Sequence, residues 1–421
     1  MSPFEALAVV LTAAATFAYV NHRWIRQPAS IALMAMALGS SLVLVAVDRL
    51  GWLQLKGAAT SLLERVNIND TLLHGMLGAL LFAGSLHINL HELRQQRLAV
   101  SALALLATAL STFFVAGLSY GIMAMVGLRL PFVYCLLFGA LISPTDPIAV
   151  LGIIKEVRVP KSMETQIAGE SLFNDGVGVV IFVTVLGTIS RGGSVGAGEV
   201  LGLFVREAVG GILFGLATGY ATYRLLCSID HYQTELLLTL ALVVGGYALA
   251  ERLHISGPLA AVSAGLLIGN QGRSRAMSDV TRDHLDKFWS LIDEILNAVL
   301  FVVVGLEVVR LTVTSRIVLA CLLVIPAVLF ARFTSVALSL AGFSRTARPA
   351  KGTLAVLTWG GLRGGISVAL ALSAPSGPEH DVLVAMTYAV VVFSILVQGL
   401  TLGAVARRFA GGGEVRTSAN P

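Results

Sequence analysis

Two carboxylates lie inside one long apolar segment of this 421-residue chain. Residues 169–176 read Gly-Glu-Ser-Leu-Phe-Asn-Asp-Gly, which places Glu170 and Asp175 in a run long enough to cross a membrane as a helix. An acidic residue at the centre of a membrane helix costs about 2.5–3.5 kcal/mol on insertion scales, so such residues mark functional sites by default. A third carboxylate, Asp146, lies in Ser-Pro-Thr-Asp-Pro at 143–147, which interrupts the preceding apolar run. These two segments are therefore expected to carry the function.

The oxygen atoms of the two segments suit a small hard cation. Ser171 and Asp175 are four residues apart, so they share one face of a helix. The interrupted segment adds the Asp146 carboxylate, the Thr145 hydroxyl and backbone carbonyls freed from helical hydrogen bonds. Broken helices in transporters coordinate Na⁺ or H⁺ through such groups. The sequence therefore predicts a Na⁺ site formed by Asp146, Ser171 and Asp175.

The same carboxylates are expected to bind protons. Two neighbouring carboxylates in a poorly hydrated place repel each other and lose solvation, and both effects favour the protonated form near physiological pH. A cation and a proton then compete for the same negative charge. This competition is the simplest chemistry of an exchanger, in which loading one ion releases the other.

Glu170, on the same helix, is expected to have a structural role, whereas Asn174 is predicted to belong to the ion- and proton-binding residues together with Asp175, Asp146, Ser171 and Thr145. Glu170 and Asn174 are also four residues apart, one step around the helix from the Ser171 and Asp175 face. Arg363 lies in another apolar run and needs an acidic partner there. Glu170 is the predicted partner, and the pair is expected to tie two helices together.

Other polar residues in apolar runs are also expected to be structural. Arg332 is predicted to neutralise Asp293 or Glu294. Three histidines near the third apolar run lack metal-ligand spacing and are expected to be interfacial, with pH sensing as the alternative: His74, His87 and His91.

The composition indicates a polytopic helical membrane protein. Hydrophobic residues make up 56% of the chain and charged residues only 13%, against about 25% charged residues in soluble domains. The net charge of +5 resides in short loops, which argues for membrane topology and against nucleic-acid binding. The chain has no phosphate-binding loop motif, and its three cysteines form no disulfide or metal pattern. We therefore expect a protein that is not an enzyme, has no cofactor and has monovalent cations and protons as its partners.

Thirteen spans are predicted. Placing the N-terminus outside gives the cytoplasmic loops twice as many Lys and Arg residues as the outer loops, so the C-terminus is expected inside a cell membrane. The last residues, 411–421, are expected to form a short cytoplasmic tail. The predicted spans are 4–20, 31–47, 71–88, 98–127, 131–154, 162–190, 198–226, 233–251, 256–270, 286–310, 315–341, 351–374 and 382–406.

Two of these spans are interrupted at corresponding places. The fifth contains the Ser-Pro-Thr-Asp-Pro segment, and the twelfth contains Trp-Gly-Gly-Leu-Arg-Gly-Gly at 359–365. Pro removes backbone donors and Gly weakens a helix, so both segments should be broken. If spans 1–6 and 8–13 are inverted repeats, the two breaks fall in the fifth member of each repeat. This pattern indicates a secondary transporter with its site where broken helices cross at the midplane.

Three motifs resemble those of monovalent cation:proton antiporters of the NhaP and sodium/proton-exchanger type. They are the two segments at 143–147 and 169–176 and Gly-Gly-Leu-Arg-Gly-Gly-Ile-Ser at 360–367. Residues 288–301 also look like the tenth span of that family. One departure occurs in the third span, where many relatives have Phe-Glu-Gly and this chain has Ala83 in place of the acidic residue. That departure bears on ion coordination and on the working pH range.

The resemblance implies a thirteen-helix homodimer with an NhaA-like antiporter fold. It implies one transport unit, 1–410, with a mobile core including 71–190 and 286–406 and a dimerisation bundle including 4–47 and 198–270. It further implies that Asp175 is the main carboxylate for the ion and the proton, with Asp146, Ser171 and Thr145 as its neighbours. The pair Asn174 and Asp175 matches the electroneutral class of that family.

The favoured function is electroneutral Na⁺(Li⁺)/H⁺ antiport by alternating access. K⁺/H⁺ antiport is the close alternative, because oxygen ligands alone do not separate the two cations. An ion-coupled organic-anion symporter is less favoured because the sequence shows no second recognition site. A cation channel is less favoured because broken helices with paired carboxylates fit alternating access better.

Overall fold

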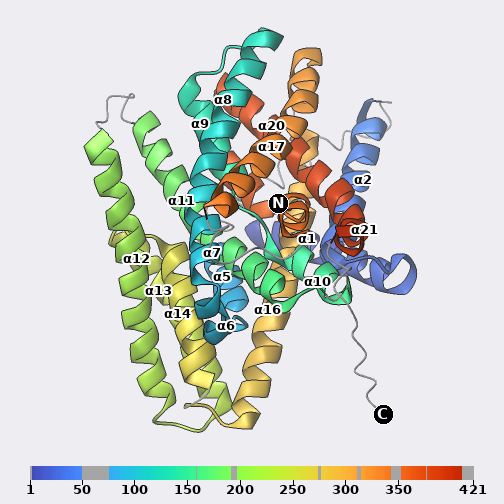
Figure 1. Ribbon diagram of the computed structural model, residues 1–421. Coiled ribbons are helices and arrows are strands. Elements are labelled where there is room, and N and C mark those ends of the chain that lie inside the picture. Colours follow the sequence, from blue (N-terminus) through green and yellow to red (C-terminus); the bar gives the residue numbers. More distant parts are fainter. Residues whose placement is uncertain are drawn as a thin grey trace, which may run out of the picture.

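The computed structural model describes residues 2–49, 75–157, 159–190, 197–273, 276–310, 314–342, 352–375 and 377–409. Every regular element in these ranges is a helix, as the composition predicts. The helices form one bundle, and many of them run roughly parallel to its long axis (Figure 1). His74 and the predicted tail, 411–421, lie outside the described residues.

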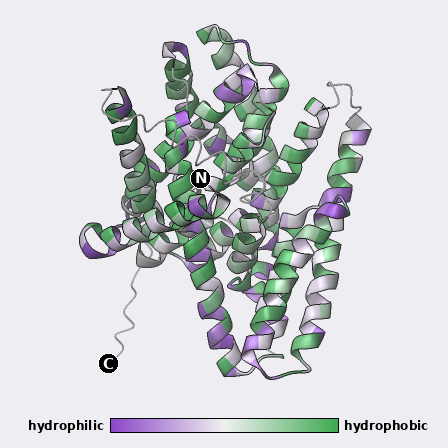
Figure 2. Cartoon of the chain, turned by 180° about the vertical axis from the view of Figure 1, so that it is seen from behind, coloured by the Kyte–Doolittle hydropathy of each residue, from purple (hydrophilic) through white to green (hydrophobic). Residues whose placement is uncertain are grey.

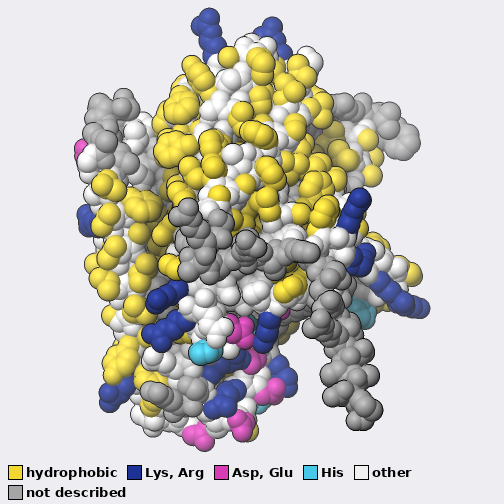
Figure 3. Space-filling model, in the orientation of Figure 1, with side chains coloured by type: hydrophobic (Ala, Val, Ile, Leu, Met, Phe, Trp, Pro, Cys, Tyr) yellow, Lys and Arg dark blue, Asp and Glu magenta, His cyan; other side chains and the backbone are white. Residues whose placement is uncertain are grey.

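The outer surface of the bundle is apolar, as a membrane protein requires. Large side chains such as Phe113 and Leu213 are more than half exposed, and hydrophobic side chains prevail over the upper half of the view in Figure 3. Figure 2 shows the same predominance from behind, with more hydrophilic residues towards the lower end. The protein is therefore a multi-pass membrane protein. Eight helices in the described ranges are long and apolar enough to span a membrane: Phe4–Ile25, Ala29–Asp48, Arg97–Val126, Lys161–Ser190, Leu201–Leu226, Tyr232–Arg252, Ser315–Ala341 and Pro378–Phe409.

The first half of the chain contains a short amphipathic helix that the sequence analysis did not predict. This helix, α6, follows α5 directly and precedes the long helix formed by α7, the π-helical turn η3 and α8. The helices of this half are α1 (Pro3–Val20), α2 (Ala29–Arg49), α5 (Leu77–Leu86), α6 (Leu90–Gln95), α7 (Arg97–Ser101), η3 (Ala102–Ala107), α8 (Thr108–Val126), α9 (Phe132–Ile142), α10 (Pro147–Val157) and α11 (Lys161–Ser190).

The second half begins with three packed helices and contains a second interrupted helix before its last one. In this half α14 continues into the π-helical turn η4 (Ile268–Gly272), and α20 continues through a similar turn, η6 (Ser394–Gly399), into α21. The α-helices are α12 (Ala197–Leu226), α13 (Tyr232–Arg252), α14 (Gly257–Leu267), α16 (Asp279–Glu307), α17 (Ser315–Ala341), α18 (Thr353–Trp359), α19 (Gly365–Leu372), α20 (Pro378–Phe393) and α21 (Leu400–Phe409).

Side-chain caps fix where several of these helices begin. Ser256 accepts a hydrogen bond from the backbone N–H of Leu259 at the start of α14, and Ser278 accepts one from Thr281 at the start of α16. Gly127, with φ of +74°, ends α8 in the left-handed conformation that glycine adopts at little cost. The predicted start of α16 at residue 286 is wrong by seven residues, because the capped first two turns are polar and extend beyond the apolar stretch.

Two helices are interrupted at the places where the sequence predicts breaks. Pro144 has no N–H to donate to a continuing helix, so α9 ends at Ile142 and α10 restarts at Pro147. In the second half α18 ends at Trp359 and α19 restarts at Gly365. The two breaks touch each other, because the backbone N–H of Asp146 donates a hydrogen bond to the carbonyl of Leu362 at 2.8 Å. This bond satisfies one backbone donor of the first break and one acceptor of the second inside the bundle.

Close helix packing holds the interrupted segments in place. α8 packs on α9, and a Cβ at Gly139 of α9 would meet the backbone of Thr112. α12 packs on α14 in the same way, with Gly215 against the backbone of Ala260. α11 contacts α9, α12 and α14, so the helix that carries Asp175 runs between these groups.

Candidate functional site

A hydrogen-bonded network joins α11 to the break between α9 and α10. Asn174 donates from Nδ2 to the Thr145 hydroxyl at 2.9 Å, and its Oδ1 accepts the Thr145 backbone N–H at 3.3 Å. The hydroxyls of Thr145 and Ser171 lie 2.9 Å apart and share a hydrogen bond. All three side chains are buried. The network therefore fixes the non-helical loop that carries the next residue, Asp146.

Asp146 and Asp175 face a common cavity. The cavity has a volume of about 40 Å³, and both residues also line a smaller one of about 10 Å³ beside it. A buried water needs at least roughly 10–15 Å³, so the larger space accommodates a small ion with very little water. The other residues that line the larger cavity come from α5, α11, α16 and α19: Leu80, Leu81, Gly84, Leu172, Asn297, Leu300, Gly365 and Ile366.

The two carboxylates are held differently. The backbone of Asp146 is bonded to the second helix break, whereas Asp175 projects from the continuous helix α11. Asp175 is only 6% exposed, and no described residue donates a hydrogen bond to its carboxylate. Asp146 and Arg363 are close enough to interact with Asp175 electrostatically. The cavity thus has two carboxylates in its wall, and Arg363 is the basic group that interacts with Asp175.

Of the five predicted ion-site residues, two line the cavity and three support it. Asp146 and Asp175 are in the wall, whereas Thr145, Ser171 and Asn174 form the adjacent network. The structure thus brings all five together, as the i, i+4 spacing on α11 and the break at 143–147 predict. That Ser171 and the Thr145 oxygens bind the cation directly stays a prediction.

The structure adds Asn297 of α16, which the sequence analysis missed. Asn297 lines the cavity and donates from Nδ2 to the carboxylate of Asp293 at 3.2 Å and to its carbonyl at 2.9 Å. Asp293 in turn interacts electrostatically with Asp146. The i, i+4 spacing of Asp293 and Asn297 could have indicated a shared polar face. The contribution of α5 to the cavity is apolar, and Ala83 is not among the residues that line it.

The predicted pairing of Glu170 with Arg363 is wrong in its partner. Glu170 pairs with Arg332 of α17, whose guanidinium also donates to the carbonyl of Leu357 at 3.1 and 3.3 Å. The prediction that Arg332 neutralises Asp293 or Glu294 is therefore wrong, because Arg332 pairs with Glu170. Both members of the pair are at most 3% exposed. A structural role for Glu170 stays a prediction, now with Arg332 as the partner, because a buried carboxylate needs a charged partner.

Arg363 lies at the second helix break, next to this pair. It donates from Nη1 to the carbonyl of Gly361 at 2.8 Å, and its backbone N–H donates to the Ser394 hydroxyl at 2.9 Å. A Cβ at Gly361 would lie 2.8 Å from Arg332 Nε and 3.2 Å from Arg363 Nη1. Two guanidinium groups therefore flank one glycine, with Glu170 and Asp175 as the acidic groups that interact with Arg363.

Comparisons with known proteins show which family this chain belongs to. The family described as "Sodium/hydrogen exchanger, transmembrane" matches residues 10–408. The Na⁺/H⁺ antiporter NhaP of Pseudomonas aeruginosa is 48% identical over 417 residues, covering 98% of this chain and 97% of that protein. The Na⁺/H⁺ antiporter NhaH of Halobacillus dabanensis is 34% identical over 384 residues, covering 90% of this chain and 91% of that protein.

A solved structure has the same fold. The sodium proton antiporter MjNhaP1 from Methanocaldococcus jannaschii, determined at pH 8, superposes with a TM-score of 0.77 and 19% sequence identity. The superposition covers 97% of this chain and 99% of that one. At 19% identity this comparison shows that the two proteins share a fold.

Proposed function

Because this chain belongs to the transmembrane sodium/hydrogen exchanger family, we propose that it is a secondary-active Na⁺(Li⁺)/H⁺ antiporter in which the cation and the proton compete for Asp175 and Asp146. The names of its relatives support the substrates. The residues that perform the exchange are inferred from the site itself.

The observation that carries the proposal is the cavity shared by two carboxylates. Asp146 and Asp175 approach it from a helix break and from a continuous helix, and it has room for a small cation. A cation bound there supplies one positive charge to the two carboxylates, the same charge that a bound proton would supply. When the cation leaves, repulsion and poor hydration favour uptake of a proton instead. Each ion therefore excludes the other, and this exclusion couples their fluxes.

We further propose that the exchange is electroneutral, with one proton moved for each cation. The pair Asn174 and Asp175 supports this stoichiometry. Asn174 is occupied in the neutral network with Thr145, so α11 presents a single carboxylate, Asp175, to the cavity. Alternating access follows if the cavity opens to one side of the membrane at a time.

We propose a thirteen-span arrangement of inverted repeats around this site. The two touching breaks support it, because each falls in the fifth span of its proposed repeat. The repeats would comprise spans 1–6 and 8–13, with a mobile core, a dimerisation bundle and a homodimeric assembly. The positive-inside rule supports an outer N-terminus and a cytoplasmic C-terminus in the cell membrane.

K⁺/H⁺ antiport is the second candidate, since carboxylate oxygens bind both ions. The small cavity argues for the smaller cation, because Na⁺ and Li⁺ need less space than K⁺. An organic anion would need a larger space, and its charge would be repelled by the two carboxylates. The proposed function needs neither an enzymatic reaction nor a cofactor.

The test is proton flux driven by cations in proteoliposomes that contain a trapped pH dye. We expect an imposed pH gradient to dissipate on addition of Na⁺ or Li⁺, with a much weaker response to K⁺. Electroneutral exchange should be unaffected when the membrane voltage is changed with a K⁺ ionophore. A strong K⁺ response would favour the second candidate, and no response to any of the three cations would refute antiport.

A substitution at the helix break tests the role of Asp146 indirectly. A Cβ at Gly364 would lie 3.1 Å from the Cβ and Cγ of Asp146, although the φ of −98° suits any residue. We expect Gly364→Ala to displace this carboxylate and to raise the Na⁺ concentration for half-maximal exchange by about tenfold or more. The measurement is the same dye assay over a Na⁺ titration.

The matched control is Gly245→Ala in α13, where a Cβ would meet no atom within 4 Å. This variant should retain the wild-type Na⁺ dependence. An unchanged Na⁺ dependence in Gly364→Ala as well would show that the position of Asp146 does not set the affinity.

A further inference from the structure

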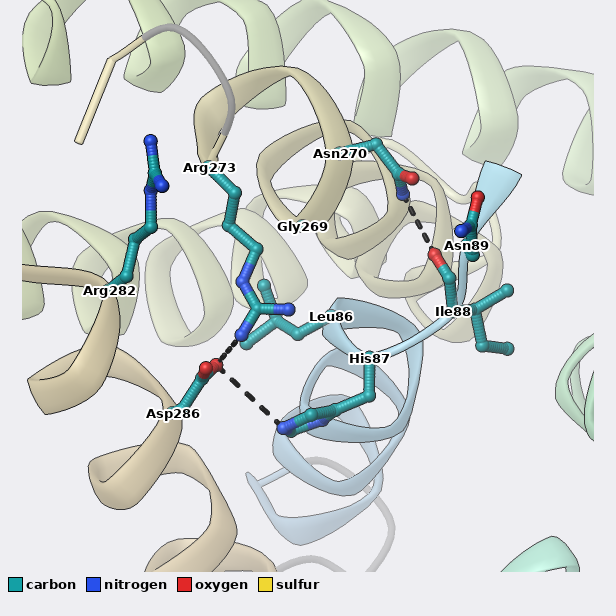
Figure 4. A pocket seen from close by; sticks show the side chains of 9 residues that line it. All are labelled: Leu86, His87, Ile88, Asn89, Gly269, Asn270, Arg273, Arg282 and Asp286. Atoms are coloured by element: carbon teal, nitrogen blue, oxygen red, sulfur yellow. Dashed lines mark hydrogen bonds and ion pairs between the residues drawn. The ribbon is translucent and has the colours of Figure 1, made fainter. Parts of the chain in front are cut away.

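A second polar cavity lies near the end of the bundle where charged side chains gather. It has a volume of about 560 Å³ and is formed by the end of α5, the turn η4 and the first turns of α16 (Figure 4). This volume is within the range of sites for small ligands, roughly 300–1,000 Å³. Its lining residues are Leu86, His87, Ile88, Asn89, Gly269, Asn270, Arg273, Arg282 and Asp286.

The walls of this cavity are held by contacts that do not depend on a ligand. Asn270 donates to the carbonyl of Ile88 at 2.9 Å and accepts the backbone N–H of Leu90 at 2.9 Å. Gly269 packs against the backbone of Leu86, where a Cβ would lie 2.8 Å from the Leu86 Cα. The turn η4 and the end of α5 are thus fixed to each other, and the cavity is preformed.

The donors in this cavity favour an anion. Arg273 forms an ion pair with Asp286, and His87 Nε2 lies 3.8 Å from the same carboxylate (Figure 4). Arg282 extends from α16 one turn before Asp286 and bonds through Nη1 to the exposed Asp279 at 3.0 Å. The Nε of Arg282 is buried and has no hydrogen-bond partner among the described residues. A buried donor without a partner carries a desolvation cost that a ligand oxygen would remove.

We propose that this cavity binds a phosphoryl oxyanion between Arg282, Arg273 and His87. The planar guanidinium group of arginine matches phosphate oxygens with two parallel hydrogen bonds. The lining has two arginines and one carboxylate, and the second nearby acid, Asp279, pairs with Arg282 from outside the lining and is 96% exposed. Leu86 and Ile88 add an apolar edge that would contact the non-phosphate part of the ligand.

The phosphoryl group has two possible sources, an anionic lipid headgroup and a soluble phosphate. The cavity lies in the loops that the positive-inside rule assigns to the cytoplasm, where both sources occur. Figure 3 shows basic and acidic side chains together at the lower end of the bundle, below the apolar band. Both sources present the same phosphoryl oxygens to the cavity, and the experiment below distinguishes a lipid headgroup from a soluble phosphate.

The experiment measures binding, so it does not depend on antiport activity. Purified full-length protein is titrated with radiolabelled inorganic phosphate. In a second arm, native mass spectrometry counts the phosphatidylglycerol and phosphatidylcholine molecules that remain bound. We expect retention of phosphatidylglycerol over phosphatidylcholine, saturable phosphate binding, or both. Arg282→Gln should weaken whichever binding is seen by about tenfold or more, as loss of charged hydrogen bonds predicts.

The matched control is Arg94→Gln, which removes an exposed positive charge from the neighbouring helix α6. This variant should leave binding unchanged. Arg282→Lys, which keeps the charge and loses the planar fork, should bind with intermediate strength and also serves if Arg282→Gln folds poorly. Binding of lipid alone identifies the headgroup as the source, and binding of phosphate alone identifies a soluble ligand. Absence of both, or equal loss in the Arg282 and Arg94 variants, would overturn the proposal.

Discussion

Asp175→Asn should reduce Na⁺-driven proton flux to the background of liposomes without protein. Asparagine has nearly the same shape as aspartate, so the cavity and the neighbouring network should persist. The amide, however, has no negative charge to hold a cation and does not exchange a proton near neutral pH. Because Asp175 is the carboxylate that α11 presents to the cavity, both half-reactions are lost together. The measurement is dye-reported flux per molecule of folded protein.

Folding and charge must be controlled separately in this experiment. The melting temperature of Asp175→Asn should stay close to that of the wild type, because the removal of a buried charge offsets the loss of its attraction to Arg363. Asp283→Asn provides the matched control, since Asp283 is an exposed acid that pairs with Lys287 on the surface of α16. That control should keep full flux. Wild-type turnover in the Asp175 variant would exclude this carboxylate from the mechanism.

The site could be predicted from the sequence where the signal is local. Pro144 and Pro147 lack backbone donors and lie three residues apart, so the local sequence strongly favours a break between them, whereas the single Pro326 lies within the continuous helix α17. The shared face of Ser171 and Asp175 follows from the helix period. The contact between Ser171 and Thr145 depends on packing between helices. Because unpaired polar groups are costly in lipid, the sequence already indicates that such groups form hydrogen bonds with one another.

The partner of Glu170 could not be predicted in this way. Two intramembrane arginines, Arg332 and Arg363, satisfy the same charge requirement, and sequence spacing does not say which helix lies beside α11. In the structure α17 brings Arg332 to Glu170, while the second break turns Arg363 towards Gly361. Tertiary packing therefore decides which of the two arginines pairs with Glu170.

Helix ends in polar sequence were missed for a related reason. A search for apolar runs detects the lipid-facing length of a helix, so it places the start of α16 too late and overlooks α6. These polar turns have their own local signals. Ser278 caps α16, and Asn89 caps α6 by accepting the backbone N–H of His91. In α6, Glu92 also accepts a hydrogen bond from Lys161 at 3.0 Å, which lowers the pKa of this carboxyl group and ties α6 to the start of α11.

Glu170→Gln should destabilise the protein more than it alters ion selectivity. The wild-type cluster contains two buried guanidinium groups, Arg332 and Arg363, that flank Gly361. Glu170 is the carboxylate paired with one of them. Glutamine keeps an acceptor oxygen but removes the charge. The two buried cations would then repel each other, with Asp175 as the remaining acidic group that interacts with Arg363 among the described residues. Breaking one member of a buried ion pair costs about 3–5 kcal/mol.

The measurement is thermal unfolding of purified Glu170→Gln beside Glu164→Gln, a loss of the same charge six residues earlier on α11. Glu164 is partly exposed in the first turn of α11, and its electrostatic interaction with Lys161 is of the weak surface kind, so its variant should melt close to the wild type. The Glu170 variant should melt at a clearly lower temperature, whereas the folded fraction should keep the wild-type preference among Na⁺, Li⁺ and K⁺. Equal melting of all three proteins would show that the pair does not stabilise the fold. A changed cation preference at unchanged stability would instead move Glu170 into the ion site, because only a group that touches the cation or sets the charge of Asp175 alters selectivity without altering folding.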